Sequence, residues 1–429
     1  MVDDAARATS ANTKKAVEDA DVRPAVLVIG GKTKIVEKAH DLGLRVVYVQ
    51  YPNSYRREHW EYVSQALLLD YSDLDRLLPL VRALHQAFPF RKVVSLFELG
   101  LLPAAKIDEM LGLGGNSVTT VEMLLDKSFM RRHINALGIS PVAHAVGRGE
   151  DDLRRFVAEH GLPVVIKPTR EAGSICVFVV REEAELAPVV ARYHELGTTF
   201  DAIDLAGPMD AFLMEEYLDG PEISVESLSF AGRHVVIGIT DKVTGPAFVE
   251  LGHSTPSRHP AELLAQVEAL VHRFLDAVGL QEGPAHTELK LTSRGPRIIE
   301  SHNRVGGDRI NELTELAYGV DMDRYALAIP FGLVEPLPGR PAAVQGAAIR
   351  FLTPPPGRVV AIHGEDVIAG DPDLVEVELE VEPGDVVREL RWSEDRVGHV
   401  IARGATTDEA IANCERLVAA LRIETEPVR

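Results

Sequence analysis

The sequence predicts a multidomain protein that combines α/β and α+β architecture. Short apolar runs alternate with helical patterns over residues 25–97, which is typical of a parallel sheet. Apolar segments joined by short polar turns recur over residues 163–300, which indicates antiparallel hairpins. A proline-rich stretch at residues 333–341 then separates a last unit of short strands and one helix. The 429 residues suffice for roughly two to four domains.

Composition narrows the class of protein. Hydrophobic residues make up 46% and charged residues 26% of the chain, as in ordinary globular proteins. The net charge of −20, without a long basic run, argues against nucleic-acid binding. The two cysteines, Cys176 and Cys414, exclude a disulfide framework. With no apolar run of about 20 residues and no signal segment, we expect a cytoplasmic protein without a membrane partner.

Residues 1–23 are polar and are expected to form a flexible tail. Residues 24–115 are predicted to form an N-terminal α/β domain. The apolar run of residues 25–31 ends in two glycines and predicts a buried strand with a tight turn. The pattern continues with a helix, a strand, a helix and a strand at residues 34–42, 45–50, 74–88 and 92–97.

The rest of the chain is expected to form a middle domain at residues 116–335 and a C-terminal domain at residues 340–429. Helices are predicted at residues 121–137, 153–160, 261–278, 308–318 and 408–421. Strands are predicted at residues 163–168, 176–180, 212–216 and 298–300, with a loop or insertion at residues 197–210.

Two carboxylates, Glu288 and Glu300, are the first candidates for chemistry. They lie on segments joined by a turn at residues 293–295, so both could face one cleft. Mg²⁺ is commonly held by one or two carboxylates with phosphate oxygens and water, and Asn303 could add a neutral oxygen. A hairpin with two solvent-facing carboxylates would show the same spacing.

Two lysines could neutralise phosphate. Lys167 ends an apolar run, where a buried ammonium without a partner is costly. A triphosphate would supply that partner, although a lysine that reaches solvent from the strand end gives the same pattern. Lys127 lies on a predicted helix, where exposed lysines are common.

Small residues follow Lys167 and predict a loop that could close over phosphate. The backbone N–H groups of Gly173 and Ser174 could meet phosphate oxygens there. The loop matches neither the Walker pattern nor GxGxxG. Gly30 and Gly31 lack the third glycine of the dinucleotide fingerprint, which argues against a Rossmann dehydrogenase.

Residues 212–226 carry the strongest local signal. They predict a strand through Glu215 and Glu216, a connection, and a second strand from Glu222. Extended backbone in this stretch could receive an adenine, and Glu222 could bind a ribose diol. A polar hairpin with surface glutamates is the alternative.

In this order the motifs resemble the ATP-grasp superfamily. The motifs are Asp126-Lys127, Lys167-Pro168, the string from Glu215 to Glu222, His286-x-Glu288, Glu300 and Arg304-x-Gly306-Gly307. From about residue 25 onward the chain is most similar to carboxylate–amine ligases, namely L-amino-acid ligases of the bacilysin synthetase type. The resemblance implies an ATP-grasp fold with an N-terminal α/β domain, a clamp of two subdomains and a small C-terminal domain that contributes to the cleft or to a dimer interface.

The resemblance assigns roles around ATP and Mg²⁺, for which Mn²⁺ can substitute. Lys127 and Lys167 would hold the α- and β-phosphates, and residues 172–174 would cover the γ-phosphate. Glu215 and the backbone of residues 216–218 would receive adenine, and Glu222 the ribose. Glu288 and Glu300 would bind one or two metal ions.

One position departs from the family pattern. The second metal strand of the family commonly reads Glu-x-Asn-x-Arg, whereas this chain reads Glu300-Ser-His-Asn-Arg304. His302 therefore stands where the family has asparagine. Either His302 ligates metal or faces a phosphate, or Asn303 takes the role instead.

The resemblance also implies the reaction, in which a small carboxylic or amino acid is joined to an amine through an acyl phosphate, with release of ADP and phosphate. Catalysis would rest on Lys167, on Arg304 at the carboxylate or the phosphoryl group, and on the N–H groups of Gly306 and Gly307 at the oxyanion. Secondary metabolite biosynthesis and a homodimer are what the analogy suggests.

The sequence offers three further candidates for contact with the substrate. Residues 241–256 resemble the segment that lines the substrate site of the amino-acid ligases, which makes Lys242 and His253 candidates. A surface lysine and a structural histidine are the alternatives. Glu98, just after a predicted strand, could bind an ammonium group.

Two other functions remain open. An ATP-grasp carboxylase or purine-pathway enzyme would activate bicarbonate or formate, but residues 248–253 fit the amino-acid ligases better and no Met-Lys-Met segment for biotin is present. A catalytically dead nucleotide-binding protein would be expected to lack a metal carboxylate or a phosphate lysine, and both pairs are present here. His302 is the only sign in favour of a dead site.

Overall fold

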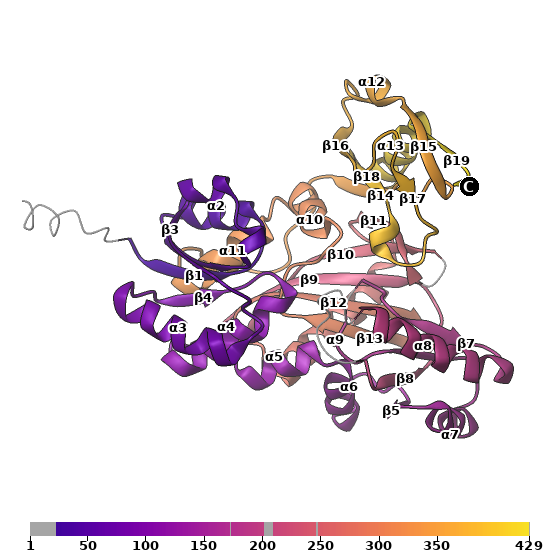
Figure 1. The fold of residues 1–429 in the computed structure, drawn as a ribbon, viewed down its shortest axis with the longest axis horizontal. Coiled ribbons are helices and arrows are strands. Elements are labelled where there is room, and N and C mark those ends of the chain that lie inside the picture. The colour runs from indigo at the N-terminus through magenta and orange to yellow at the C-terminus, as the bar shows by residue number, and fades with distance from the viewer. Residues whose placement is uncertain (1–22, 172, 201–208, 246–247, 429) are drawn as a thin grey trace, which may run out of the picture. The chain divides into compact units, whose positions relative to one another are not determined.

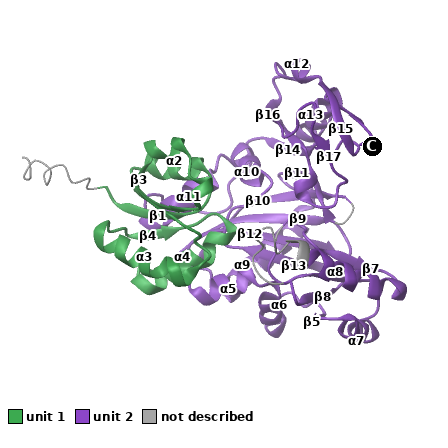
Figure 2. Cartoon of the chain, viewed as in Figure 1, with its two compact units in different colours: residues 1–114 green, residues 115–429 purple. Residues whose placement is uncertain are grey.

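The computed structural model describes residues 23–171, 173–200, 209–245 and 248–428 (Figure 1). The expected tail, residues 1–23, lies outside this part of the chain except for its last residue. The chain divides into two compact units, residues 1–114 and 115–429 (Figure 2). No helix in the described ranges combines the length and the apolar character that a membrane crossing requires.

Unit 1 is the predicted parallel α/β domain. Its four strands are β1 (Ala25–Ile29), β2 (Arg45–Gln50), β3 (Val63–Leu68) and β4 (Lys92–Val94), in the order β3-β2-β1-β4 and all parallel. The helices are α2 (Thr33–Asp41), α3 (Leu74–Ala87) and α4 (Glu98–Leu111). Every residue of β1 is buried, as expected for a central parallel strand. β3 escaped prediction because it is an edge strand that alternates exposed and half-buried residues.

Unit 2 begins with two helices where the sequence predicted one. α5 (Val118–Leu125) and α6 (Lys127–Ala136) are separated at Asp126, whose backbone is extended. The Asp126 carboxylate accepts hydrogen bonds from the N–H groups of Ser128 and Phe129, at 3.0 and 3.1 Å. Because such a cap satisfies the free donors of a new helix, the second helix begins at Lys127.

A four-stranded antiparallel sheet follows. Its strands, β5 (His144–Gly147), β6 (Val164–Pro168), β7 (Phe178–Val180) and β8 (Phe212–Glu216), lie in the order β5-β8-β6-β7. Helices α7 (Glu150–His160) and α8 (Leu186–Phe200) contribute to its core, for example through Phe156 and Tyr193. The loop predicted at residues 197–210 is wrong up to residue 200, because α8 continues to that point. Residues 201–208 of that loop lie outside the described ranges.

An eight-stranded antiparallel sheet forms the body of unit 2, in the order β13-β12-β9-β10-β11-β14-β18-β16. The strands are β9 (Glu222–Phe230), β10 (Arg233–Thr244), β11 (Glu250–Thr255), β12 (Gly283–Thr292), β13 (Gly295–His302), β14 (Gly346–Phe351), β16 (Leu374–Leu379) and β18 (Gly398–Gly404). β14 pairs with β11, so one sheet continues across the proline-rich stretch that the sequence suggested as a linker.

On strand β12 of this sheet, one face is apolar and the other carries polar and charged residues. On β12, Ala285, Leu289 and Leu291 pack with helix α9 (Ala261–Val278) and with α5 and α6. Because side chains alternate along a strand, His286, Glu288 and Lys290 project from the opposite face. The apolar core therefore holds these polar residues on one surface of the sheet.

The remaining elements complete unit 2. They are α10 (Ile310–Tyr318), α11 (Met322–Ala328), β15 (Gly357–His363), α12 (Glu365–Ile368), β17 (Val386–Val387), α13 (Thr407–Ala420) and β19 (Arg422–Glu426). Strands β17, β15 and β19 form a small antiparallel sheet.

Candidate nucleotide and metal site

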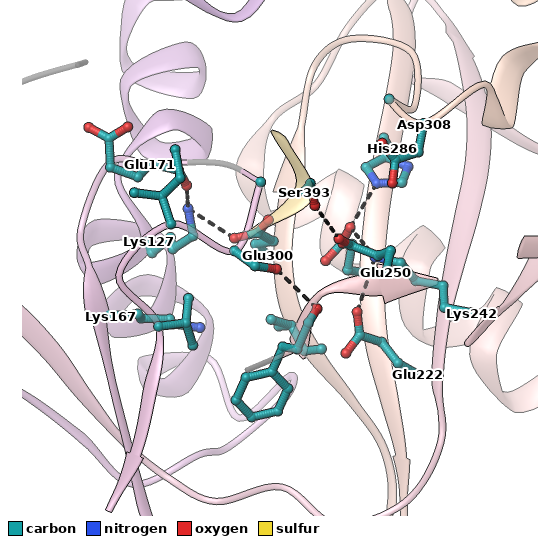
Figure 3. Close-up of a pocket in the computed structure, with 18 of the residues that line it drawn as sticks. Lys127, Lys167, Glu171, Glu222, Lys242, Glu250, His286, Glu300, Asp308 and Ser393 are labelled. Atoms are coloured by element: carbon teal, nitrogen blue, oxygen red, sulfur yellow. Dashed lines mark hydrogen bonds and ion pairs between the residues drawn. The ribbon is translucent and has the colours of Figure 1, made fainter. Parts of the chain in front are cut away.

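A pocket of about 420 Å³ in unit 2 is lined by residues from the four-stranded and the eight-stranded sheets of that unit. This volume suits a small organic ligand. Predicted site residues in its lining are Lys127, Lys167, Gly173, Ser174, Glu215, Glu216, Leu218, Glu222, Lys242, His253, Glu288, Glu300, His302, Arg304 and Gly307. Figure 3 shows Lys127 and Lys167 on one side, facing Glu222, Lys242 and Glu250 on the other. The fold thus gathers residues that are up to 180 positions apart in the chain.

The two predicted metal carboxylates lie side by side. Glu288 on β12 is paired with Glu300 on β13, and His286 is paired with His302 in the same ladder. Each glutamate side chain is only 15% exposed. The Lys127 ammonium lies 2.9 Å from Glu300 Oε2, and the Lys242 ammonium lies 2.6 Å from Glu288 Oε1. A hairpin with two solvent-facing carboxylates is thereby excluded.

Both carboxylates are ionised. Burial acts to raise the pKa of Glu300, but the Lys127 ammonium and the hydrogen bond to His302 outweigh it and hold that pKa well below its usual value. Burial likewise acts to raise the pKa of Glu288, but the Lys242 ammonium and His286 hold it below the ordinary carboxyl range. Ionised carboxylate oxygens on paired strand positions are donors of the kind that a hard divalent cation requires.

A buried histidine supports Glu288 from behind. His286 Nε2 lies 3.0 Å from Glu288 Oε1, and its Nδ1 lies 2.7 Å from Glu226 Oε1. Burial acts to lower the pKa of His286, yet the two carboxylates raise it to about 9. The imidazolium therefore donates to both glutamates and fixes the orientation of Glu288. In the sequence, His286 is distinguished only as the first residue of the motif His286-x-Glu288.

The structure places His302 and Asn303 differently. His302 lines the pocket, and its Nε2 lies 3.3 Å from Glu300 Oε1. Asn303 is the next residue and is absent from the lining of this pocket within the described residues. Asn303 follows the end of β13, in a bend, and its buried Oδ1 makes no hydrogen bond among the described residues, so its assignment as a metal ligand stays a prediction.

The second lysine is tied to a buried glutamate. Lys167 Nζ lies 2.7 Å from Glu215 Oε2, and Arg131 Nε donates to Glu215 Oε1 at 2.6 Å. Burial acts to raise the pKa of Glu215, but the two cations lower it to about 2. Glu215 is thus ionised and holds Lys167 at the pocket wall. Arg131, which is fully buried, was not singled out from the sequence.

Lys242 lies in a cluster of three carboxylates rather than at the surface. Its ammonium is 2.6 Å from Glu288, 3.0 Å from Glu222 and 3.4 Å from Glu250. The three carboxylates offer oxygens that lie within 4.8 Å of one another. Burial acts to lower the pKa of Lys242, but these carboxylates raise it well above its usual value. Lys242 therefore joins the predicted ribose residue Glu222 to the metal residue Glu288.

The loop after β6 folds toward the pocket. Gly173 and Ser174 both have left-handed backbone, with φ of +69° and +61°. Ser174 Oγ donates to the carbonyl of Phe248 at 3.1 Å, which links this loop to the segment before β11. The part of the predicted phosphate cover at residue 172 lies outside the described ranges.

A further cluster was missed from the sequence. His253 Nε2 lies 3.2 Å from Asp308 Oδ2, and the Arg396 guanidinium donates to both oxygens of Asp308 at 2.8 and 2.6 Å. Ser393 Oγ donates to Glu250 Oε2 at 2.8 Å (Figure 3). Asp308 directly follows Gly307, so the glycine motif could have pointed to it. Nothing local could have pointed to Arg396, which is 88 residues from its partner.

Two other predicted residues lie elsewhere. Gly306 is outside the described lining of this pocket, and a Cβ added there would lie 3.1 Å from His286 Nδ1, so its lack of a side chain permits close packing. Glu98 is the first residue of α4 in unit 1. Its assignment to a substrate ammonium stays a prediction.

Comparison with known proteins agrees with this arrangement. Residues 36–115 match the ATP-grasp N-terminal domain, residues 160–312 the ATP-grasp domain, and residues 350–426 the L-amino acid ligase C-terminal domain 2. The solved structure of an L-amino acid ligase from Bacillus licheniformis superposes with a TM-score of 0.79 at 24% identity, covering 94% of this chain and 99% of that chain. That likeness shows the fold.

Curated relatives include ligases. The alanine–anticapsin ligase of Bacillus subtilis strain 168 is 30% identical over 248 residues, which is 54% of this chain and 52% of the relative. Human carnosine synthase 1 is 28% identical over 347 residues, covering 74% of this chain and 40% of the relative. The chain thus spans about half the length or less of these ligases.

The solved structure of phosphoribosylglycinamide synthetase from Anaerococcus prevotii shares the fold. It superposes with a TM-score of 0.68 at 19% identity, covering 94% of this chain and 100% of that chain. The domain matches and the common fold together show that this chain belongs to the ATP-grasp superfamily and has a C-terminal domain of the L-amino-acid ligase type.

Proposed function

We propose that this protein is an ATP-dependent ligase that joins a small carboxylic or amino acid to an amine through an acyl phosphate. The observation that carries the proposal is the pairing of Glu288 with Glu300, each beside a buried lysine, in a pocket of about 420 Å³. Paired carboxylates and lysines are what a Mg²⁺-bound triphosphate needs for charge balance.

The residues present fit Mg²⁺. Glu288 and Glu300 offer ionised oxygens, and Glu222 and Glu250 have oxygens near Glu288. When bound, Mg²⁺ would neutralise charge on the phosphoryl oxygens of ATP. The Lys242 ammonium occupies the carboxylate cluster in this structure, so it offsets part of the negative charge of those residues without a metal ion.

The lysines would bind the phosphates. Lys127 is buried and opens α6, where helix N–H groups also favour an anion. It bonds Glu300 and the carbonyl of Glu171. Lys167, held by Glu215, lies in the same pocket lining. Both ammonium groups are therefore fixed in place before a triphosphate arrives, which lowers the entropy cost of binding.

Two bond exchanges would make the amide. A substrate carboxylate oxygen attacks the γ-phosphorus, and ADP leaves with the bonding electrons. The amine nitrogen then attacks the carbonyl carbon of the acyl phosphate, inorganic phosphate leaves, and the nitrogen loses one proton. Arg304, in the pocket lining, would hold the carboxylate or the phosphoryl group, and the N–H of Gly307 would meet the oxyanion.

The acceptor end would lie at the cluster of His253, Asp308 and Arg396. Its three side chains are polar and joined by hydrogen bonds, which favours a polar substrate held by hydrogen bonds. The names of the relatives, alanine–anticapsin ligase and carnosine synthase, support amino acids as substrates. The domain matched by residues 350–426 favours an amino-acid ligase over a carboxylase, since the fold itself occurs in both kinds of enzyme.

Phosphate release from Mg·ATP tests the proposal. The protein is given single and paired amino acids and other small carboxylic acids, and products are identified by mass spectrometry. We expect phosphate release that requires an acid and an amine, with ADP and a condensed product. Turnover that depends on bicarbonate or formate would instead indicate a carboxylase or purine-pathway enzyme, and nucleotide binding without any turnover would indicate a dead site.

A further inference from the structure

A second group of metal-ligating side chains lies on the last strands of the eight-stranded sheet. Glu378 on β16 is paired with His399 on β18, and Glu376 is two residues before Glu378 on the same strand. Because residues two apart share a face, both carboxylates lie beside the histidine. One ligand atom from each of the three residues lies within 4.8 Å of the other two.

One ring nitrogen of the histidine in this group, Nε2, lacks a hydrogen bond among the described residues. The side chain of His399 is only 5% exposed, and its Nε2 makes no hydrogen bond within the described part of the chain. The His399 Nε2 atom lies 3.4 Å from Glu376 Oε1 and 3.8 Å from Glu378 Oε2. The ring of Phe351 is 6.2 Å from that of His399 in an edge contact. A buried polar nitrogen that faces two carboxylates without a bond is rare, because such groups are normally satisfied.

These distances suit an ion between the three side chains. Ligands about 2.0–2.1 Å from a tetrahedral Zn²⁺ lie roughly 3.3 Å from one another. The observed separations of 3.4 and 3.8 Å need only small rotations of two glutamates whose side chains are 35% and 51% exposed. We propose that Glu376, Glu378 and His399 form a second cation site, for a divalent transition metal such as Zn²⁺, with water as a further ligand.

The residue types set the preference for a transition metal. Imidazole nitrogen favours zinc and its neighbours, whereas Mg²⁺ prefers an all-oxygen set. The histidine distinguishes this cluster from the carboxylates around Lys242 in the nucleotide pocket, which offer oxygen ligands alone.

The charged side chains around this cluster favour a bound cation. The Arg309 guanidinium bonds Glu376 Oε2, so Oε1 is the oxygen that faces His399. Glu312 lies 3.7 Å from the same arginine. With one arginine and three carboxylates, the charged side chains of the cluster have an excess of negative charge. The proposed cation site does not depend on the proposed ligase activity, so its test is independent of the test of that activity.

Metal titration of the full chain, without a polyhistidine tag and with excess Mg²⁺ to fill the oxygen sites, tests the proposal. Co²⁺ is the probe because a site with nitrogen and few ligands gives intense visible bands. We expect one equivalent of Co²⁺ that Zn²⁺ displaces. His399→Gln should weaken this binding at least tenfold, since even indirect supports of metal sites cost about 10–100-fold when removed.

His363→Gln is the matched control, since His363 is also on a strand near a glutamate but its side chain is 58% exposed. It should bind Co²⁺ as the unaltered chain does. If His399→Gln does not fold, judged by its far-ultraviolet circular dichroism, Glu378→Gln replaces it, because that side chain is half exposed. Two results would overturn the proposal. One is that the unaltered chain binds no equivalent of Co²⁺, and the other is that the folded variant binds Co²⁺ as tightly as the unaltered chain.

Discussion

Glu288 and Glu300 lie opposite each other on β12 and β13, and each is neutralised by a lysine from a different element. Lys242 comes from β10 and Lys127 from the start of α6. Two like charges on adjacent strands would repel, so the two ammonium groups are what permits both carboxylates to stay ionised in the absence of a metal. Mg·ATP would take over part of that charge balance, which leads to the predictions below.

Removal of either carboxylate should abolish metal-dependent chemistry. Glu288→Gln and Glu300→Gln keep the shape of the side chain but remove the charged oxygen. We expect each to lower Mg²⁺-dependent phosphate release by at least about a hundredfold, because such electrostatic contacts are worth 10²–10³ in rate. Steady-state phosphate assays with the identified substrates measure this. Glu262→Gln, at an exposed site in the first turn of α9, should retain full activity. Unchanged rates in both site variants would contradict the metal assignment.

Lys242 should compete with Mg²⁺ for the carboxylate cluster. Lys242→Met leaves Glu222, Glu250 and Glu288 without their shared cation, so the metal-free protein should lose about 3 kcal/mol of stability. Added Mg²⁺ should then raise the melting temperature of the variant more than that of the unaltered chain. Lys32→Met, at an exposed position, should change neither quantity. An equal Mg²⁺ effect on all three chains would mean that the cluster does not bind the ion.

Glu215 should stabilise the fold in a pH-dependent way. Its folded pKa is about 2, below the ordinary 4.5, so its contribution is complete above pH 4.5 and is lost as the pH falls toward 2. The shift corresponds to about 3 kcal/mol. Glu215→Gln should therefore be less stable near neutral pH, and this deficit should shrink in acid. Urea unfolding at several pH values measures it, with the exposed Glu159→Gln as control. A deficit that stays constant down to pH 2 would contradict the assigned shift.

Asp308 and Arg396 should act as a unit. Their two hydrogen bonds join the glycine motif to the segment before β18. A double-mutant cycle with Asp308→Asn and Arg396→Ala should show a coupling of about 1.5–3 kcal/mol in urea unfolding. In the proposed ligase, both variants should raise KM for the acid or amine while nucleotide affinity in calorimetry stays near that of the unaltered chain. Additive effects on stability, or a loss confined to nucleotide binding, would contradict this.

The helix break at Asp126 should matter for nucleotide binding. Asp126→Ala removes the cap of α6 and should cost about 1 kcal/mol of stability. Because Lys127 is the first residue of that helix, the affinity for Mg·ATP should fall as well. Thr406→Ala removes the corresponding cap of α13 and gives the matched control, since it should cost similar stability without a change in nucleotide affinity. Equal nucleotide affinities in the two variants would show that the cap does not position Lys127.

Strong local patterns made much of the fold predictable. Residues 261–278 form a helix with the predicted bounds, because their apolar spacing repeats over many turns. The hairpin that presents Glu288 and Glu300 followed from two strands and a short turn, and the structure confirms that the two carboxylates are paired. Weak patterns were misleading. The break at Asp126 depends on one side-chain cap, and residues 197–200, predicted as the start of a loop, continue helix α8.

By itself the sequence determined the superfamily, the order of the motifs and the residue types of the site. Only the tertiary structure decided which of these residues meet. His302 rather than Asn303 faces the pocket because strand pairing sets the register, and Lys242 contacts Glu288 across 46 residues. Arg396 reaches Asp308 because β14 and β18 extend the sheet that begins with β13. Such contacts leave no local periodicity in the chain, since they arise from pairing between distant strands.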